Sequence, residues 1–414
     1  MFVFRREDLP ADPEFSAELD KLGYFINDQD QIRKISDPTE EFQFKINKNE
    51  RWNQVQREAM NGKYPLAYAT TSPLRNECIR NIVLPRLRAL GLVTLRLPLM
   101  SGPTKPHVPI LVSNNLSTAS RIILVFGEPA QDLGIWAYRT VGSENINAGS
   151  AVNFVKAILS PEERGHTSGP NEAAGKVPSS HKGEVAVVLA NPGQLSWHCG
   201  LARAMTQVTR MAVSRASAVH PPLRETGRNR IPGHENWQEH VSSVFEGIFT
   251  ARGQLVRSDA KIDVIGLAEG GCGAIRYLAN NWPAWRQYIS AICLSHPLHQ
   301  KDTDLLVAGQ EPHPESFAAF VSSRCRAYVL SPEPLGTPLP EEEKSGCNCY
   351  ASGEELNTEC IMTKAWPHML DWLKRAYDDP DYCEAKLVLR RVGLGDGVDG
   401  DDGDLSHQIQ ELEV

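Results

Sequence analysis

Seven short apolar runs, separated by stretches with helical spacing, constrain the fold of this chain more than any other feature. The runs occupy residues 92–98, 108–113, 121–127, 184–190, 262–267, 289–295 and 325–331. The later runs are almost continuously apolar, which is typical of strands in a parallel sheet covered on both faces. Helical patterns fall between them, at about 148–158, 200–219, 235–251, 271–281, 314–323 and 363–377. This alternation predicts an α/β fold with a doubly wound, mostly parallel sheet.

The segments outside this alternation divide the chain into three parts. Residues 1–60 contain short polar–apolar alternations between turn signals, and we predict a small β-meander there that packs on the core as an extension. The core domain is expected over 61–385, with polar insertion loops at 160–182 and 332–349. Residues 386–414 are acidic and rich in Gly and Asp, and they are predicted to form a disordered tail.

The charge balance and hydropathy limit the kinds of partner. The 414 residues include 43 Lys and Arg against 51 Asp and Glu, which gives a formal net charge of -8. An acidic chain has no overall attraction for phosphate backbones, so we expect no direct nucleic-acid binding. No apolar stretch is long enough to span a membrane, and the N-terminus lacks the apolar core of a signal peptide. We therefore expect an intracellular chain without membrane association.

The sequence contains no metal or cofactor motif. Of its nine cysteines only Cys347 and Cys349 are closely spaced, and no second pair of Cys or His completes a zinc site. The phosphate-binding pattern G-x-x-x-x-G-K-[ST] and the zinc pattern H-E-x-x-H are also absent. We therefore expect no metal and no cofactor.

One strand end has the outline of the sharp turn that carries the nucleophile in α/β-hydrolases. In "VIGLAEGG", Gly266, Ala268 and Gly270 occupy the positions of G-x-S-x-G, and Gly271 follows at the start of a helix. Ala268 replaces the serine and has no nucleophilic atom. The small residues also have a structural explanation, because they let the helix cross the strand end closely.

The other positions of a hydrolase site are altered as well. The acid position follows the run at 325–331, where the sequence offers Glu333, and the histidine position ahead of the last helix holds Asn357. Acyl transfer needs a base within hydrogen-bond reach of the nucleophile. With nucleophile and histidine both replaced, we predict a pseudo-hydrolase with no catalytic residues. The alternative is a hydrolase with an unusual nucleophile, either Glu269 or Cys272.

Two loops that follow strands are candidates for lining a pocket. The first begins at Gly127, where a hydrolase has its oxyanion loop, and leads to Trp136. The second, "NPGQLSW", contributes Asn191, Gln194 and Trp197. These five residues are our candidates for the lining of a small-ligand pocket.

Several stretches together resemble the Argonaute-binding protein two (Arb-two) domain family. They are "LGYFINDQDQIRKI" and "RWNQVQREAM" near the N-terminus, "IILVFGEPAQDLGIWAYRTV", "VVLANPGQLSW", the turn "VIGLAEGG" and the closing "NTECIMTKAWPHMLDWL". The resemblance runs from about residue 20 to residue 377. It implies an α/β-hydrolase-like fold. Fungal members of the family are either the Arb-two subunit of the Argonaute siRNA chaperone complex or the C-terminal domain of class II histone deacetylases.

The resemblance also implies a role and partners. The role is in small-RNA-directed heterochromatin silencing, with a location in the nucleus and the cytoplasm. The implied partners are Argonaute and another subunit of its complex, or a histone deacetylase complex, and a homodimer is a further candidate assembly. The chain has no room for a deacetylase domain, so it is more similar to the free-standing subunit. Animal relatives keep a serine at the elbow. This chain departs from the pattern at Ala268, and at Asn357 where a histidine would be expected, which again implies a chain without hydrolase activity.

Overall fold

The structure is a computed structural model that describes residues 18–21, 23–39, 67–160, 185–211, 213, 225–305, 313–340 and 343–387. The chain divides into two units, Met1–Ile262 and Asp263–Val414. The first unit has four strands of a mixed sheet, and the second has four that run side by side. The predicted fold class is therefore confirmed: the chain has an α/β fold built on a large mixed sheet with helices around it.

The first unit contains four of the strands, in the order β3, β4, β6, β5. The strand β4 (Val108–Ser113) pairs antiparallel with β3 (Leu92–Leu97) and with β6 (Val185–Ala190). The strand β5 (Arg121–Phe126) pairs parallel with β6. Every residue of β5 is buried and so is all of β6 after its first residue, as their apolar runs predict.

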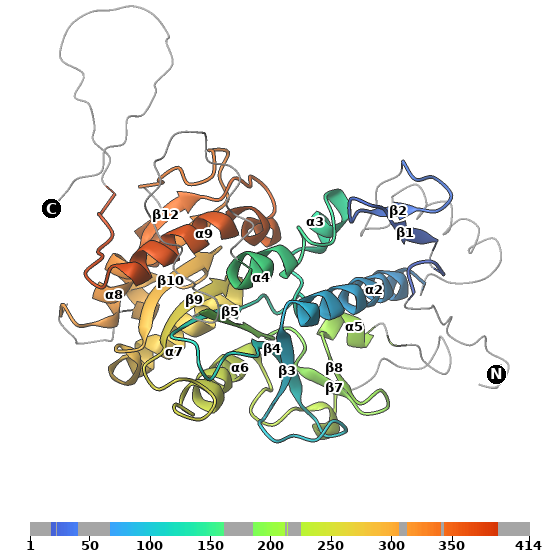
Figure 1. Ribbon diagram of the computed structural model, residues 1–414, viewed down its shortest axis with the longest axis horizontal. Helices are drawn as coiled ribbons and strands as arrows, with labels where there is room; N and C mark the ends of the chain where they lie inside the picture. Colours follow the sequence, from blue (N-terminus) through green and yellow to red (C-terminus); the bar gives the residue numbers. More distant parts are fainter. Residues whose placement is uncertain are drawn as a thin grey trace, which may run out of the picture. The chain divides into compact units, whose positions relative to one another are not determined.

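Helices and two small hairpins complete the first unit. The hairpins pair β1 (Tyr24–Ile26) with β2 (Ile32–Lys34) and β7 (Ser196–His198) with β8 (Arg203–Met205). The helices are α2 (Ala67–Ala89), α3 (Tyr138–Ser143), α4 (Val152–Leu159), α5 (Gln207–Met211), the 3-10 helix η3 (Gly227–Asn229), α6 (Trp237–Val244) and the π-helix η4 (Phe245–Phe249). The long helix α2 packs against α4 and β3, and α4 packs against β6 (Figure 1).

The β1–β2 hairpin is fastened to the rest of the first unit at its turn. Asp30 has a left-handed backbone, with φ of 61°. Its carboxylate lies 2.8 Å from the guanidinium of Arg86 in α2 and accepts a 2.8 Å hydrogen bond from Asn147. This hairpin is the described part of the extension predicted over 1–60. Residues 1–17, 22 and 40–60 lie outside the described residues.

The second unit contains β9 (Lys261–Leu267) from Asp263 onward, and then β10 (Ile289–Ser295), β11 (Cys325–Val329) and β12 (Asn348–Ala351), adjacent in that order. The β10–β11 and β11–β12 pairs are parallel. The helices are α7 (Ala268–Trp285), the π-helix η5 (Lys301–Leu305), α8 (Phe317–Arg324), the 3-10 helices η6 (Glu343–Ser345) and η7 (Thr358–Cys360), and α9 (Ile361–Asp378). Helices α7 and α8 pack against each other and β10, and α9 crosses β10 and β11. Figure 1 shows α9 and α7 on opposite sides of these strands, which is the covered parallel arrangement expected from the apolar runs.

Two predicted segments differ from the structure. The helix expected over 200–219 is wrong: the segment contains β8 and the short α5 instead. Ala204 of the β7–β8 hairpin packs with Val108, Trp197 and Ile231. This tertiary packing outweighs the helical spacing of the sequence. The loop expected over 332–349 contains the start of β12, where buried Cys349 faces the core. The Pro and Glu residues earlier in that segment are typical of a loop, so the sequence did not predict the short strand that follows them.

Three further expectations concern the ends and the inserted loops. The predicted loop 160–182 lies outside the described residues, except for Ser160, and so does the predicted tail beyond Leu387. The boundary between the two units at 262/263 falls inside the predicted core domain of 61–385. Within the described residues, no helix is both long and apolar enough to cross a membrane.

Candidate functional site

The turn between β9 and α7 has the backbone geometry of a nucleophile elbow. The strand β9 ends at Leu267, and α7 begins at the next residue without an intervening loop. Ala268 has φ of 43°, in the left-handed region that residues other than glycine rarely adopt. A G-x-S-x-G turn holds its central residue in such a strained conformation. The turn therefore has the geometry of an elbow with alanine at its central position.

Gly266 and Gly271 allow the helix to begin directly against the strand end. A Cβ atom on Gly266 would lie 2.3 Å from the Cα of Gly271, and a Cβ atom on Gly271 would lie 3.0 Å from the carbonyl group of Gly266. Backbone atoms occupy both positions, so a side chain cannot move aside to make room. Gly270 is buried within the first turn of α7. The sequence explanation of these small residues as close-packing positions agrees with this geometry.

Cys272 and Glu269 are the two candidate substitute nucleophiles. Burial raises the pKa of the Cys272 thiol more than the neighbouring Arg276 lowers it, which disfavours the reactive thiolate. Glu269 is half-buried and near His296, whose pKa is lowered by burial more than the charge of Glu269 raises it. Among the described residues, no hydrogen bond joins Glu269 or Cys272 to a histidine or a carboxylate. Within the described residues, neither side chain is thus hydrogen-bonded to a base, which is the arrangement that activates a nucleophile.

The predicted acid and histidine positions have structural roles. Glu333 is exposed, and its backbone N–H donates to the Ser331 hydroxyl at 3.1 Å. Asn357 donates from its side chain to Glu354 Oε1 at 3.2 Å and from its backbone at 3.1 Å. Burial acts to raise the pKa of Glu354, but hydrogen bonds from Lys364, the backbone and Asn357 outweigh it and lower that pKa to about 2. Asn357 thus fastens the loop before α9 and is not joined to Glu333 by any hydrogen bond in the described part.

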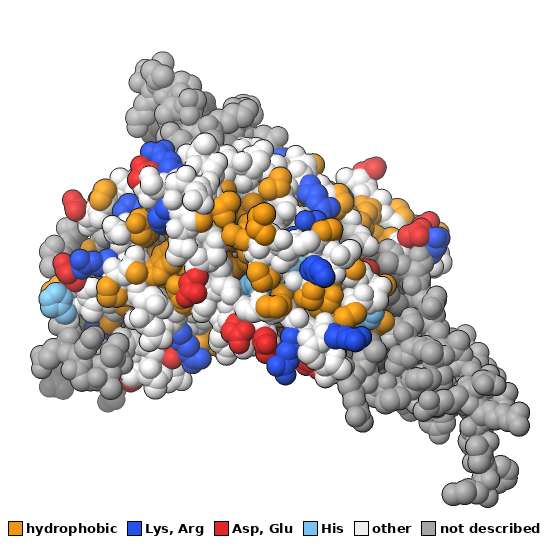
Figure 2. All heavy atoms as spheres, turned by 90° about the horizontal axis from the view of Figure 1, so that it is seen from below, with side chains coloured by type: hydrophobic (Ala, Val, Ile, Leu, Met, Phe, Trp, Pro, Cys, Tyr) orange, Lys and Arg blue, Asp and Glu red, His pale blue; other side chains and the backbone are white. Residues whose placement is uncertain are grey.

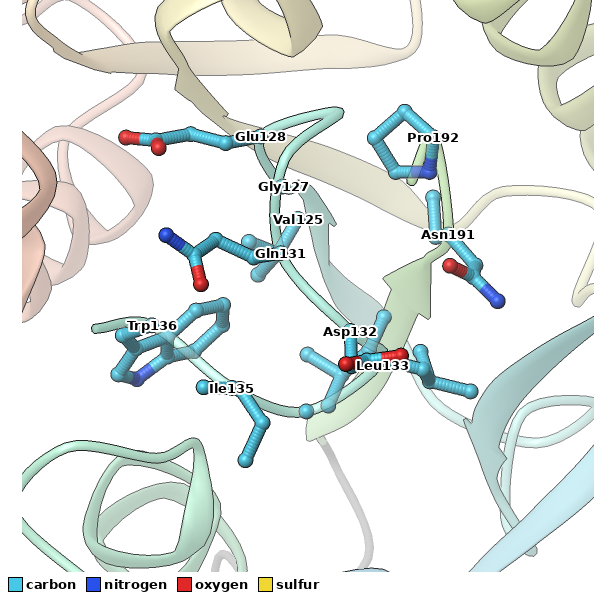
Figure 3. Close-up of a pocket in the computed structure, with 13 residues that line it drawn as sticks. Val125, Gly127, Glu128, Gln131, Asp132, Leu133, Ile135, Trp136, Asn191 and Pro192 are labelled. Carbon is cyan, nitrogen blue, oxygen red and sulfur yellow. The ribbon is translucent and has the colours of Figure 1, made fainter. Parts of the chain in front are cut away.

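The first unit has a small hollow at the carboxyl ends of β5 and β6 (Figure 3). It encloses about 290 Å³, including space open to solvent. Its lining is Val125, Gly127, Glu128, Gln131, Asp132, Leu133, Gly134, Ile135, Trp136, Leu189, Ala190, Asn191 and Pro192. The candidates Gly127, Trp136 and Asn191 are in this lining. Because that volume counts open solvent, the enclosed part of the hollow is smaller than the sites that usually bind small molecules.

The candidates Gln194 and Trp197 do not line the hollow. Gln194 is buried beneath it, where its amide donates to Asp132 Oδ1 and accepts from Asn191 Nδ2, both at 2.9 Å. Trp197 is buried in the β7–β8 hairpin cluster and stacks at a tilt against His107, with ring centroids 5.0 Å apart. The polar part of "NPGQLSW" therefore joins two loops, and its aromatic part packs in a different place.

Asp132 is the centre of this buried network, and the sequence analysis did not select it. It accepts a 2.6 Å hydrogen bond from the Tyr138 hydroxyl as well as the one from Gln194, and Arg80 lies 3.7 Å away. Burial raises the pKa of its carboxyl more than Arg80 and Tyr138 lower it. The network holds the loop 127–136 against the loop after β6. Its sequence signal was the acidic residue in the otherwise apolar "DLGIWAY".

A buried histidine pair extends the network, and the sequence analysis did not find it either. His240 Nε2 accepts a 3.0 Å hydrogen bond from the backbone of Asn191, so its proton is on Nδ1, which lies 3.0 Å from Nδ1 of His234. Burial lowers the pKa of His240 well below its usual value and that of His234 to about 4. Residues six apart do not share a helical face, but His234 precedes α6 and folds back on it.

Two features of the described residues concern the binding of metals and polyanions: the grouping of possible metal ligands and the surface charge. No group of three or more His, Cys, Asp or Glu side chains within them is arranged to hold a metal ion. On the face drawn in Figure 2, Lys and Arg side chains are interspersed with Asp, Glu and hydrophobic ones. This face has a mixed charge character.

Comparison with known proteins places these features in a family. A sequence model described as the Arb2 domain matches residues 15–335. No curated protein matches the chain. Similar solved structures include a histone deacetylase from Saccharomyces cerevisiae, at 13% identity and a TM-score of 0.39, covering 72% of this chain and 96% of that one.

Two further similar structures are esterases. Esterase Est22 has 13% identity and a TM-score of 0.32, covering 78% of this chain and 89% of its own. The fungal esterases from Rhizomucor miehei have 12% identity and a TM-score of 0.33, covering 76% of this chain and 92% of theirs. At these TM-scores the fold assignment rests on the strands and helices described above. The match over residues 15–335 confirms the family resemblance found in the sequence: the chain belongs to the Arb2 domain family.

Proposed function

We propose that this Arb2-domain chain is a binding protein without hydrolase activity that acts in Argonaute-linked, small-RNA-directed heterochromatin silencing. The observation that carries the proposal is the elbow. Ala268 holds the strained central position with φ of 43° and presents a methyl group where a hydrolase presents its nucleophile.

The surroundings of the elbow support the non-catalytic part of the proposal. The Cys272 thiol is held protonated by burial, and Glu269 has no hydrogen-bonded base among the described residues. Asn357 is engaged with Glu354 and supplies no imidazole. A strained turn costs roughly 1–3 kcal/mol, so its retention without a nucleophile fits a scaffold in which the turn sets the packing of α7.

Charge and family membership support the partner part of the proposal. The chain carries a formal net charge of -8, and such a chain has little attraction for an RNA backbone. The proposed partners are therefore proteins: Argonaute and another subunit of its complex. The proposed location is the nucleus and the cytoplasm, where small-RNA loading and silencing take place.

Affinity purification of the tagged full chain, followed by mass spectrometry, tests the partner proposal. Nuclear and cytoplasmic fractions are purified separately, with and without RNase treatment, and the tag alone serves as the control. We expect an Argonaute protein in the RNase-treated sample, because the contact is between proteins. Recovery of a histone deacetylase complex without Argonaute would favour the alternative role in deacetylation. Recovery of metabolic enzymes alone would contradict both.

A further inference from the structure

Leu356 lies in the loop after β12 and is 81% exposed, although the loop around it is firmly held. Oε1 of the buried Glu354 accepts hydrogen bonds from the backbone N–H of Leu356 at 3.2 Å and from that of Asn357 at 3.1 Å. Oε2 of Glu354 lies 2.7 Å from Nζ of Lys364. A single exposed leucine is common on protein surfaces. This one is presented by a fixed loop, and a preorganised side chain loses little entropy when a partner covers it.

A second exposed leucine lies in the loop after β11, and the two loops are in direct contact. Leu335 is 41% exposed. In its loop, the backbone N–H of Ser331 donates to the carbonyl of Glu354 at 2.9 Å. A Cβ atom on Gly353 would lie 3.3 Å from the Cβ of Leu335. Because β11 and β12 are parallel, both loops leave the same edge of the sheet, so Leu335 and Leu356 belong to one apolar surface.

The charged side chains of the two loops are all acidic. Residues 330–340 and 352–360 contain four Glu and no Lys or Arg. Two of the four, Glu333 and Glu355, are exposed. The lysine from α9 that pairs with the buried glutamate offsets only that one charge. Such a surface attracts Lys and Arg side chains, and it repels the phosphate groups of RNA and of anionic membranes.

We propose that Leu335, Leu356, Glu333 and Glu355 form a docking surface for a basic amphipathic segment of a partner protein. The apolar side chains of the segment pack against the two leucines, and its Lys or Arg side chains pair with the two glutamates. The apolar contact supplies most of the affinity, and the charges select the partner and speed its association. This docking surface lies within the second unit, and its chemistry does not depend on the identity of the partner in the proposed function.

Fluorescence anisotropy with the purified full chain tests the docking surface. The probe is a labelled peptide with Leu on one helical face and Lys on the other, and its counterpart carries Glu in place of each Lys. We expect saturable binding of the Leu/Lys peptide, and binding of the Leu/Glu peptide at least about tenfold weaker, because like charges then face each other. No saturable binding of the Leu/Lys peptide, or equal binding of both peptides, would overturn the proposal.

A matched pair of leucine variants locates the apolar contact. We expect Leu356→Ser to bind the Leu/Lys peptide at least about fivefold more weakly than the wild type. Leu201→Ser makes the same change in the first unit, at a leucine that is 52% exposed, and should bind like the wild type. Both leucines are exposed, so an unchanged urea midpoint shows that each variant is folded. An equal effect of the two substitutions would overturn the proposal. A wild-type dimer that dissociates in Leu356→Ser would do so too, because a second copy would then occupy the surface.

A matched pair of charge variants separates local charge from net charge. Glu333→Gln/Glu355→Gln should weaken binding of the Leu/Lys peptide and reduce its dependence on salt concentration. Glu144→Gln/Glu246→Gln changes the net charge equally at two exposed glutamates of the first unit. We expect that control to keep the affinity and the salt dependence of the wild type. Equal losses in both double variants would mean that the peptide responds only to the overall charge, and would overturn the proposal.

Discussion

At the scale of single residues, the lack of a side chain at Gly266 allows α7 to begin directly at the end of β9. Gly266 and Gly271 approach each other so closely that a Cβ on Gly266 would lie 2.3 Å from the Gly271 Cα. We predict that Gly266→Ala lowers the free energy of unfolding by about 2–4 kcal/mol, because backbone must shift to make room. Urea denaturation measures the change. Gly247→Ala is the control, since a Cβ there meets nothing within 4 Å, and it should stay within about 0.5 kcal/mol of the wild type. Equal stability of both variants would contradict the close packing.

Single residues also show which parts of a site can be predicted from the sequence and which cannot. The elbow was predictable because its small residues have fixed spacing along one turn. The partners of Gln194 were not, because Asp132 and Gln194 are far apart in sequence and meet only when β5 and β6 pair. Trp197 was misplaced for a similar reason: its apolar neighbours Val108 and Ile231 come from other segments.

At the scale of elements, the buried histidine pair connects α6 to the end of β6. His240 accepts from the Asn191 backbone and faces His234, and both imidazoles are neutral in the folded chain at pH 7. The unfolded chain takes up protons below about pH 6.5, whereas folded His234 does so only near pH 4. The unfolded state thus binds more protons between these values, and stability falls as the pH falls. For His234 alone the loss reaches roughly 3 kcal/mol at about pH 4.

We predict that His234→Gln weakens this pH dependence, because glutamine can accept from His240 without titrating. Urea denaturation at pH 7.5 and pH 5.0 gives the difference in unfolding free energy for each protein. The wild type should lose about 1–2 kcal/mol more than the variant over this interval. His313→Gln is the control at an exposed histidine and should match the wild type. Identical pH dependence in wild type and His234→Gln would mean that the pair is not buried in neutral form.

The elements also show where sequence patterns fail. The seven predicted strands are all present to within two residues, because each is a short, mostly apolar run with turn signals beside it. The short strands β7, β8 and β12 were missed, since three or four residues are too few to show a periodic pattern. The histidine pair was missed because the spacing rule for helices does not apply to His234, which lies in the turn before α6.

At the scale of the whole molecule, family and charge agree with a scaffold. The Arb2 domain covers residues 15–335, and the formal net charge is -8. The elbow in the second unit and the polar network in the first are each built largely from backbone contacts and buried side chains. These features stabilise loops that in a hydrolase would carry catalytic atoms. The central claim that we propose is that the chain keeps the α/β fold without hydrolase activity.

Hydrolysis of p-nitrophenyl acetate by the purified full chain tests that claim most directly. Wild type, Glu269→Ala and Cys272→Ser are compared at equal concentration with Ala268→Ser, which restores the hydroxyl at the elbow. We predict that all four proteins give the same low rate, because neither the present side chains nor a restored serine has a hydrogen-bonded base. A wild-type rate well above that of Glu269→Ala or Cys272→Ser would contradict the account and identify the chain as a hydrolase with an unusual nucleophile.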